Sequence, residues 1–169
     1  MTKTRALIFL AVFIILSGIF VASSSVSLSA TEAQQLNQGV QSISPTVIGI
    51  YTNNVQIALL EFIPVFGPGM GIYSSYNTGL ALAGIAQSSG TGVTGPEFFL
   101  ILLFTPIFWI EFACYSLAVE ESIAVLVSFR NRDFRTREWK WLLGSLIFVV
   151  STLFVSAALE VDMINFIPR

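Results

Sequence analysis

One apolar stretch, Pro96–Phe129, constrains the fold of this chain more than any other feature. As a single helix it would be about 50 Å long, whereas the hydrocarbon core of a bilayer is about 30 Å thick. The helix must therefore break, tilt or protrude. Pro106 is the natural place for a break, because proline lacks an amide hydrogen and its ring clashes with the preceding turn. The sequence thus predicts a broken or re-entrant helix before Pro106 and a spanning helix over 106–129.

Composition indicates an integral membrane protein. Of the 169 residues, 54% are hydrophobic and only 11% are charged, and the mean hydropathy is +0.80, which is far from the composition of a soluble domain. The apolar segments predict one all-α transmembrane domain, a polytopic helix bundle with five spans. The expected spans are 6–22, 46–66, 69–86, 106–129 and 141–159, with an outer loop at 23–45 and a cytoplasmic basic loop at 130–140.

The first apolar segment, Ala6–Ala22, admits two interpretations. It follows Lys3 and Arg5 and precedes three serines, which is also the pattern of a cleavable signal peptide. The segment is short for a span, but a polytopic bundle needs its first helix for packing. We expect a retained anchor, and cleavage is the alternative.

An amphipathic helix is expected within the outer loop. Ser29 and Glu32 have the spacing of a capping box at a helix start, and Pro45 ends the segment. Four apolar residues fall on one side of this helix: Ala33, Leu36, Val40 and Ile43. The helix has no lysine or arginine, so it is better explained as a cover for the bundle than as a binder of anionic lipid.

Small residues recur at four-residue intervals in the third expected span. Gly71, Ser75, Gly79 and Ala83 stack along one helix face. Such rows let a neighbouring helix approach closely in lipid, where packing replaces the hydrophobic drive. We therefore expect this face to be a helix-packing surface.

Basic residues set the expected orientation. In the five-span arrangement one side holds seven of the eight lysines and arginines: Lys3, Arg5, Arg130, Arg132, Arg135, Arg137 and Lys140. By the positive-inside rule this side is the cytoplasm. The N-terminus is then cytoplasmic, and the C-terminus, with Arg169, lies outside the cell membrane. The net charge of -2 offers no basic surface for nucleic acid.

Carboxylates within the apolar spans are the candidate functional residues, because an ionised carboxylate in hydrocarbon is costly unless it is paired or protonated. No lysine or arginine falls within an expected span, so amides and hydroxyls are the expected partners. We predict a polar cluster of Glu61, Asn77 and Glu111, for binding or for structure, with Asn54 and Tyr115 as further members. The alternative for Glu61 and Asn77 is helix packing alone.

The remaining charged and reactive residues give weaker indications of a function. Glu120 and Glu121 lie two to three turns from Arg130, so ordering the cytoplasmic end is a better explanation for them than proton transfer. The chain has no histidine, and Cys114 is its single cysteine, which removes the groups on which most metal and triad chemistry depends. We expect no enzyme activity, no metal site and no cofactor.

The middle of the chain resembles a known family. The residues that carry the likeness are Asn54, the Pro64–Gly71 hairpin, Asn77-Thr78-Gly79, Pro106-Ile107-Phe108-Trp109-Ile110-Glu111, Ala113 and Tyr115-Ser116-Leu117-Ala118. They resemble motifs of the stage II sporulation protein M family over Thr46–Ser128, about half of the chain. Ile107 and Phe108 stand where the family usually has histidine and glycine, and Thr78 stands where its Asn-Gly pair has glycine. A distant member is the expectation.

The resemblance implies a five-span membrane protein without known catalytic activity, whose sporulating relatives join a membrane complex with cell-wall hydrolases. We therefore expect a scaffold or assembly subunit with the lipid bilayer and other membrane subunits as partners, and with a homo-oligomer as an option. One alternative is a small transporter or channel subunit that uses Glu61, Glu111 and Asn77 as an ion or proton path. The other is an accessory subunit of a membrane-bound metalloenzyme.

Overall fold

The computed structural model describes residues 3–90, 92–130 and 136–166. Over these residues the chain is helical and contains no strand, which confirms the expected all-α class. The seven helices are α1 (Lys3–Ser24), α2 (Ala30–Gln41), α3 (Val47–Glu61), α4 (Phe66–Ser88), α5 (Gly95–Leu103), α6 (Pro106–Arg130) and α7 (Thr136–Phe166).

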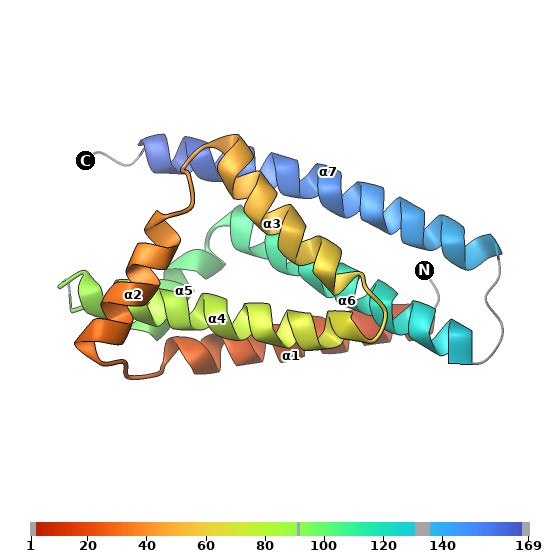
Figure 1. Ribbon diagram of the computed structural model, residues 1–169, viewed down its shortest axis with the longest axis horizontal. Coiled ribbons are helices and arrows are strands. Elements are labelled where there is room, and N and C mark those ends of the chain that lie inside the picture. The colour runs from red at the N-terminus through yellow and green to blue at the C-terminus, as the bar shows by residue number, and fades with distance from the viewer. Residues whose placement is uncertain (1–2, 91, 131–135, 167–169) are drawn as a thin grey trace.

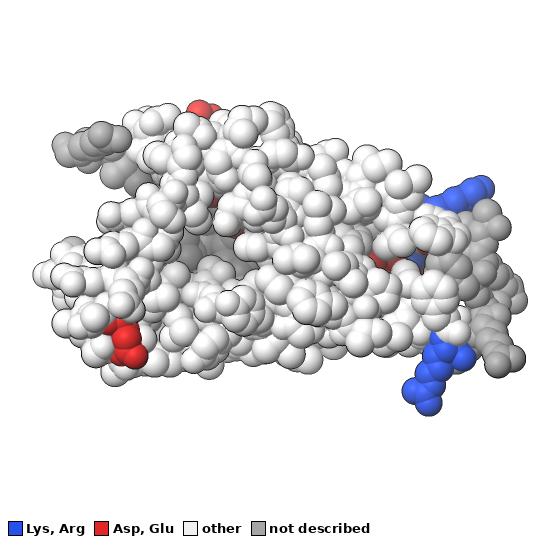
Figure 2. Space-filling view, viewed as in Figure 1, with Lys and Arg blue, Asp and Glu red and all other residues white. Residues whose placement is uncertain are grey.

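The long helices α1, α4, α6 and α7 run along the long axis of the molecule, and α3 slants across it (Figure 1). Helix α2 crosses one end of the bundle and packs on α4. Helices α1 and α7 both begin at the opposite end, where the connection between α3 and α4 also lies. The Lys and Arg side chains visible in Figure 2 gather at that same end. Charge is therefore distributed unevenly along the axis.

Three helices of the described chain are long and apolar enough to cross a membrane: α1, α6 and residues Glu138–Phe166 of α7. They contain the expected spans 6–22, 106–129 and 141–159. The expected span 46–66 is only partly helical, because α3 has 15 residues and is about 23 Å long. Helix α4 has 23 residues but carries a polar run from Ser74 to Thr78.

Helix bounds differ from the expected spans, because hydropathy marks the lipid-facing part of a helix and not its ends. Helix α7 begins at Thr136 and continues to Phe166, so part of the expected basic loop is helical. Residues 131–135 of that loop and Arg169 lie outside the described residues. Helix α4 begins at Phe66, before Pro68, because a proline in the first helical turn removes an N–H that would have no partner in any case.

The long apolar stretch breaks next to Pro106, where the sequence predicts it. Helix α5 ends at Leu103 and α6 begins at Pro106. Trp109 Nε1 donates a 2.9 Å hydrogen bond to the Leu103 carbonyl, which satisfies a backbone group that the break leaves without a helical partner. The stretch therefore becomes two helices with a capped junction.

The capping box at the start of α2 is confirmed. The Ser29 backbone N–H donates to Glu32 Oε2 at 2.8 Å, and the Glu32 N–H donates to Ser29 Oγ at 3.3 Å. The two hydrogen bonds that Ser29 gives to the Glu32 carboxylate lower its pKa below the ordinary value of 4.5. This reciprocal pairing fixes where α2 begins.

The row of small residues on α4 is buried, with Gly71, Ser75, Gly79 and Ala83 all facing the interior. A side chain at Gly71 would meet Val119 and Leu16, and one at Gly79 would meet Ser23 and the Phe20 carbonyl. Helix α1 therefore packs directly against the backbone of α4. Next to this contact a core forms around the buried side chains of Val12, Leu16, Phe20, Phe108, Phe112 and Val119.

Candidate functional site

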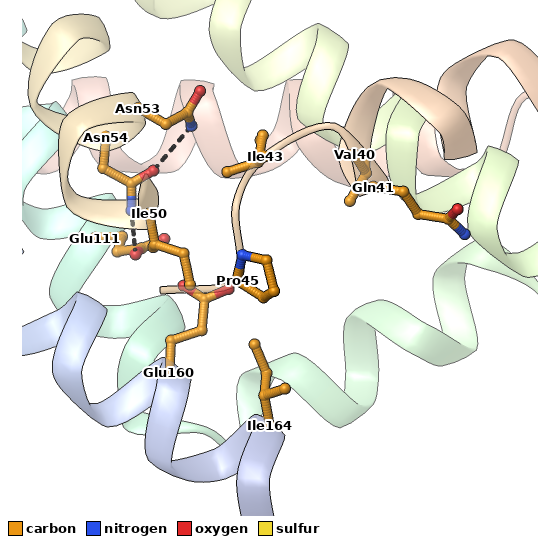
Figure 3. Close-up of a pocket in the computed structure, with 10 residues that line it drawn as sticks. All are labelled: Val40, Gln41, Ile43, Pro45, Ile50, Asn53, Asn54, Glu111, Glu160 and Ile164. Carbon is orange, nitrogen blue, oxygen red and sulfur yellow. Dashed lines mark hydrogen bonds between the residues drawn. The ribbon is translucent and has the colours of Figure 1, made fainter. Parts of the chain in front are cut away.

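A polar cavity opens between the α2–α3 connection, α3, α6 and α7 (Figure 3). Its volume is about 400 Å³. Ten residues line it: Val40, Gln41, Ile43, Pro45, Ile50, Asn53, Asn54, Glu111, Glu160 and Ile164. The lining residues come from chain segments that are far apart in the sequence, so the site forms only when the bundle is folded.

Glu111 is held by side chains from two neighbouring helices. Asn54 Nδ2 on α3 donates to Glu111 Oε1 at 2.7 Å, and Ser156 Oγ on α7 donates to the same oxygen at 3.2 Å. Asn53 Nδ2 in turn donates to Asn54 Oδ1 at 3.2 Å, which orients the Asn54 amide. The second oxygen, Oε2, accepts no hydrogen bond from the described residues. Glu111 is thus fixed in place with one carboxylate oxygen available.

A second carboxylate, Glu160, faces the same cavity from α7. It follows Ser156 by four residues and so lies on the same face of that helix. Its side chain points toward Pro45 and the Asn54–Glu111 pair (Figure 3), and both carboxyl groups line the same cavity. None of the ten residues that line the cavity is basic. The site therefore brings two carboxyl groups together with no basic side chain among its lining residues.

A neighbouring cavity of about 330 Å³ shares five lining residues with the first: Val40, Ile43, Asn53, Asn54 and Glu111. It adds polar side chains from α4 and α6: Ser74, Ser75, Asn77, Thr78 and Tyr115. Figure 2 shows the molecule hollowed between α2 and α3, with acidic side chains visible beside the hollow. The Asn54–Glu111 pair therefore lines both cavities.

The structure divides the polar cluster that the sequence predicts. Asn54, Asn77, Glu111 and Tyr115 line the same cavity, but Asn77 donates its amide to the Tyr73 carbonyl of its own helix at 2.8 Å. Glu61 lies elsewhere, because it is two turns, about 10 Å, beyond Asn54 along α3. It is fully buried and accepts a 2.9 Å hydrogen bond from Ser74 Oγ. Among the described residues, Glu61, Asn77 and Glu111 are not hydrogen-bonded to one another, but Ser74, the partner of Glu61, lines the same cavity as Asn77 and Glu111.

A buried ion-pair network at the other end of α6 was missed by the sequence analysis. Arg5 Nε lies 2.8 Å from Glu120 Oε1, and Arg5 Nη2 lies 2.5 Å from Glu121 Oε2. The expectation that no basic residue pairs with carboxylates inside the spans is wrong, because α1 begins at Lys3 and carries Arg5 into the bundle. Two adjacent glutamates in an apolar segment were the available signal, since they require a countercharge.

The network also reaches α7. Glu138 Oε2 is 3.8 Å from Arg5 Nη1, Ser145 Oγ donates to Glu121 Oε1 at 2.7 Å, and the guanidinium lies 5.8 Å from the centre of the Trp141 ring. Arg5 and Glu121 thereby connect α1, α6 and α7. The basic partner of Glu120 and Glu121 among the described residues is Arg5, whereas the sequence suggested Arg130.

An apolar layer separates this network from the polar cavity. Its buried members are Ala58, Phe62, Cys114, Ala118, Val149 and Leu153, from α3, α6, α7 and the residue after α3. Cys114 and Ala118 lie between Glu111 and Glu121 on α6. Along this interface, the two polar sites are therefore not continuous.

Comparisons of the chain with known protein families, with curated proteins and with solved structures find no match. Among the residues that the structure describes, no group of three or more histidine, cysteine, aspartate or glutamate side chains could hold a metal ion. The fold defines an all-helical protein with three helices that fit a membrane location. Inside the bundle, α6 carries two polar sites, the cavity around Glu111 and the ion-pair network of Glu120 and Glu121.

Proposed function

We propose that this protein is a non-catalytic integral membrane protein that serves as a scaffold or assembly subunit of a larger membrane complex. The observation that carries the proposal is the apolar layer around Cys114, Ala118 and Leu153, which separates the cavity from the ion-pair network. A conducting pore needs a continuous polar path, whereas a scaffold needs rigidly connected helices. The links that Arg5 and Glu111 make between helices support the second requirement.

The proposed topology has five crossings, with the N-terminus in the cytoplasm and the C-terminus outside. Three candidate spans support it directly by length and composition. Helices α3 and α4 supply the other two, since they run in opposite directions along the bundle and their connection lies at the end where α1 begins (Figure 1). The location of the visible basic side chains at this end favours its being cytoplasmic (Figure 2).

The resemblance of Thr46–Ser128 to the stage II sporulation protein M family supports the same function through its sequence motifs. Asn54 and Glu111, two residues of those motifs, are hydrogen-bonded to each other. In this proposal their contact holds α3 against α6, and the complex partner binds the outer surface.

Purification from the native membrane in a mild detergent tests the scaffold proposal. We expect the protein to co-migrate with other integral membrane proteins at a fixed ratio, identified by mass spectrometry and verified by cross-linking before extraction. The same purification is carried out on a Glu111→Gln variant. A Glu32→Gln variant, changed on the exposed outer helix, is its matched control. A chain that migrates alone in every mild detergent and is not cross-linked to other proteins would contradict the proposal.

A small transporter is the second candidate, and one observation favours it. Glu111 and Glu160 line a cavity of about 400 Å³ that is also lined by three side-chain amides, those of Gln41, Asn53 and Asn54, which is the kind of site a carrier places within the membrane. Liposomes that contain the purified chain separate the candidates. A carrier gives pH-dependent ion flux that Glu111→Gln abolishes, and a scaffold gives flux no greater than empty liposomes.

A further inference from the structure

We propose that the cavity around Glu111 and Glu160 is a binding site for a small organic cation, a primary alkylammonium. The site is distinct from the outer surface through which a scaffold would bind its partners. Binding here would add a ligand-sensing role to the proposed assembly function, and it does not depend on that function being correct.

Charge is the first reason. Glu111 on α6 and Glu160 on α7 direct two carboxylates at one space, and no basic residue is among the ten that line it. Arg5, which compensates Glu120 and Glu121, does not line this cavity. Two like charges in a partly desolvated site repel each other, and a bound cation would convert that repulsion into attraction.

The free acceptors have the number and chemistry that an ammonium group needs. Oε2 of Glu111 and the carboxylate of Glu160 accept no hydrogen bond from the described residues. A primary ammonium has three N–H donors and no acceptor. One ammonium head can therefore be shared between Glu111 and Glu160, which line the same cavity.

The walls and size select an organic cation over a bare metal ion. The rest of the lining includes aliphatic side chains, those of Val40, Ile43, Pro45, Ile50 and Ile164, which suit a short alkyl chain. A volume of about 400 Å³ falls in the range of about 300 to 1,000 Å³ typical of small-molecule sites. None of the ten described residues that line the cavity is aromatic, so they do not form the cage that favours quaternary ammonium groups.

Calorimetric titration of the full chain in detergent with n-butylammonium tests this inference. We expect saturable binding by the wild type and about tenfold weaker binding by Glu160→Gln, which loses one charged acceptor. Glu160 is half-buried and accepts no hydrogen bond from a described residue, so this variant should fold. Asn53→Ala, which removes the side chain that orients Asn54 against Glu111, is a second variant and should also bind more weakly. Glu32→Gln, on the exposed outer helix, should bind like the wild type.

Neutral and inorganic probes complete the test. n-Butanol, which has the same alkyl chain without the charge, and sodium ions at equal ionic strength should give no saturable binding. The inference is overturned if the wild type does not bind n-butylammonium, if n-butanol or sodium binds equally well, or if neither variant weakens binding. None of these results bears on the scaffold proposal, which is tested by co-purification.

Discussion

Arg5 compensates two carboxylates that would otherwise lie buried without a countercharge. Glu120 and Glu121 are 1% and 2% exposed, and removal of one partner from a buried ion pair costs about 3 to 5 kcal/mol. We therefore expect Arg5→Met to lower the free energy of unfolding in detergent by about this amount. Chemical unfolding followed by tryptophan fluorescence would measure the loss.

Two further variants separate this effect from a general loss of positive charge. Lys3→Met removes an exposed charge two residues away and should leave stability unchanged. Arg5→Met combined with Glu120→Gln and Glu121→Gln removes the three buried charges of the network and should recover most of the loss, because uncharged groups carry a much smaller desolvation cost. Equal destabilisation by Lys3→Met, or no recovery in the combined variant, would contradict the assignment.

At the level of helix packing, the contact between α1 and α4 depends on Gly79. A methyl group there would meet Ser23 Oγ and the Phe20 carbonyl on α1, and Ser23 Oγ already donates to that carbonyl at 3.0 Å. We expect Gly79→Ala to destabilise the protein by about 1 to 3 kcal/mol, the usual cost of overpacking. Gly18→Ala is the control, because nothing lies within 4 Å of its added methyl group. Equal unfolding curves for the two variants would rule out close α1–α4 packing.

The start of α2 should depend on pH. The pKa of Glu32 is lowered in the folded chain by its hydrogen bonds with Ser29, so the stabilisation is present above the ordinary value of 4.5 and is lost as pH falls through the folded pKa. We expect amide hydrogen exchange at residues 30–33, corrected for intrinsic rates, to accelerate below about pH 4.5. Glu32→Gln keeps a capping side chain that does not titrate and should abolish the acceleration. The same acceleration in both proteins would show that another group is responsible.

At the scale of the whole molecule, local features could be predicted from the sequence and distant pairings could not. The Pro106 break and the Ser29–Glu32 capping box depend on residues within one or two turns, and both are present. The Arg5–Glu120 pair joins residues 115 positions apart, and it exists only because α1 and α6 pack side by side. The positions of Glu111 and Asn54 within apolar segments marked them as candidates, but which partners they meet depends on packing that no local pattern encodes.

The three-crossing and five-crossing arrangements differ in where the connection between α3 and α4 lies. Both arrangements place Ser27 and Met163 outside and Lys140 in the cytoplasm. Labelling at those three positions therefore tests only the crossings made by α1, α6 and α7. Ile63, which is 45% exposed in the α3–α4 connection, reaches the cytoplasmic face only if α3 and α4 also cross. Single cysteines at these four positions, in a Cys114→Ala chain, can be labelled on intact cells with a membrane-impermeant maleimide. We expect Ser27→Cys and Met163→Cys to react directly, and Lys140→Cys and Ile63→Cys to react only after permeabilisation. Direct labelling of Ile63→Cys would reduce the count to three crossings.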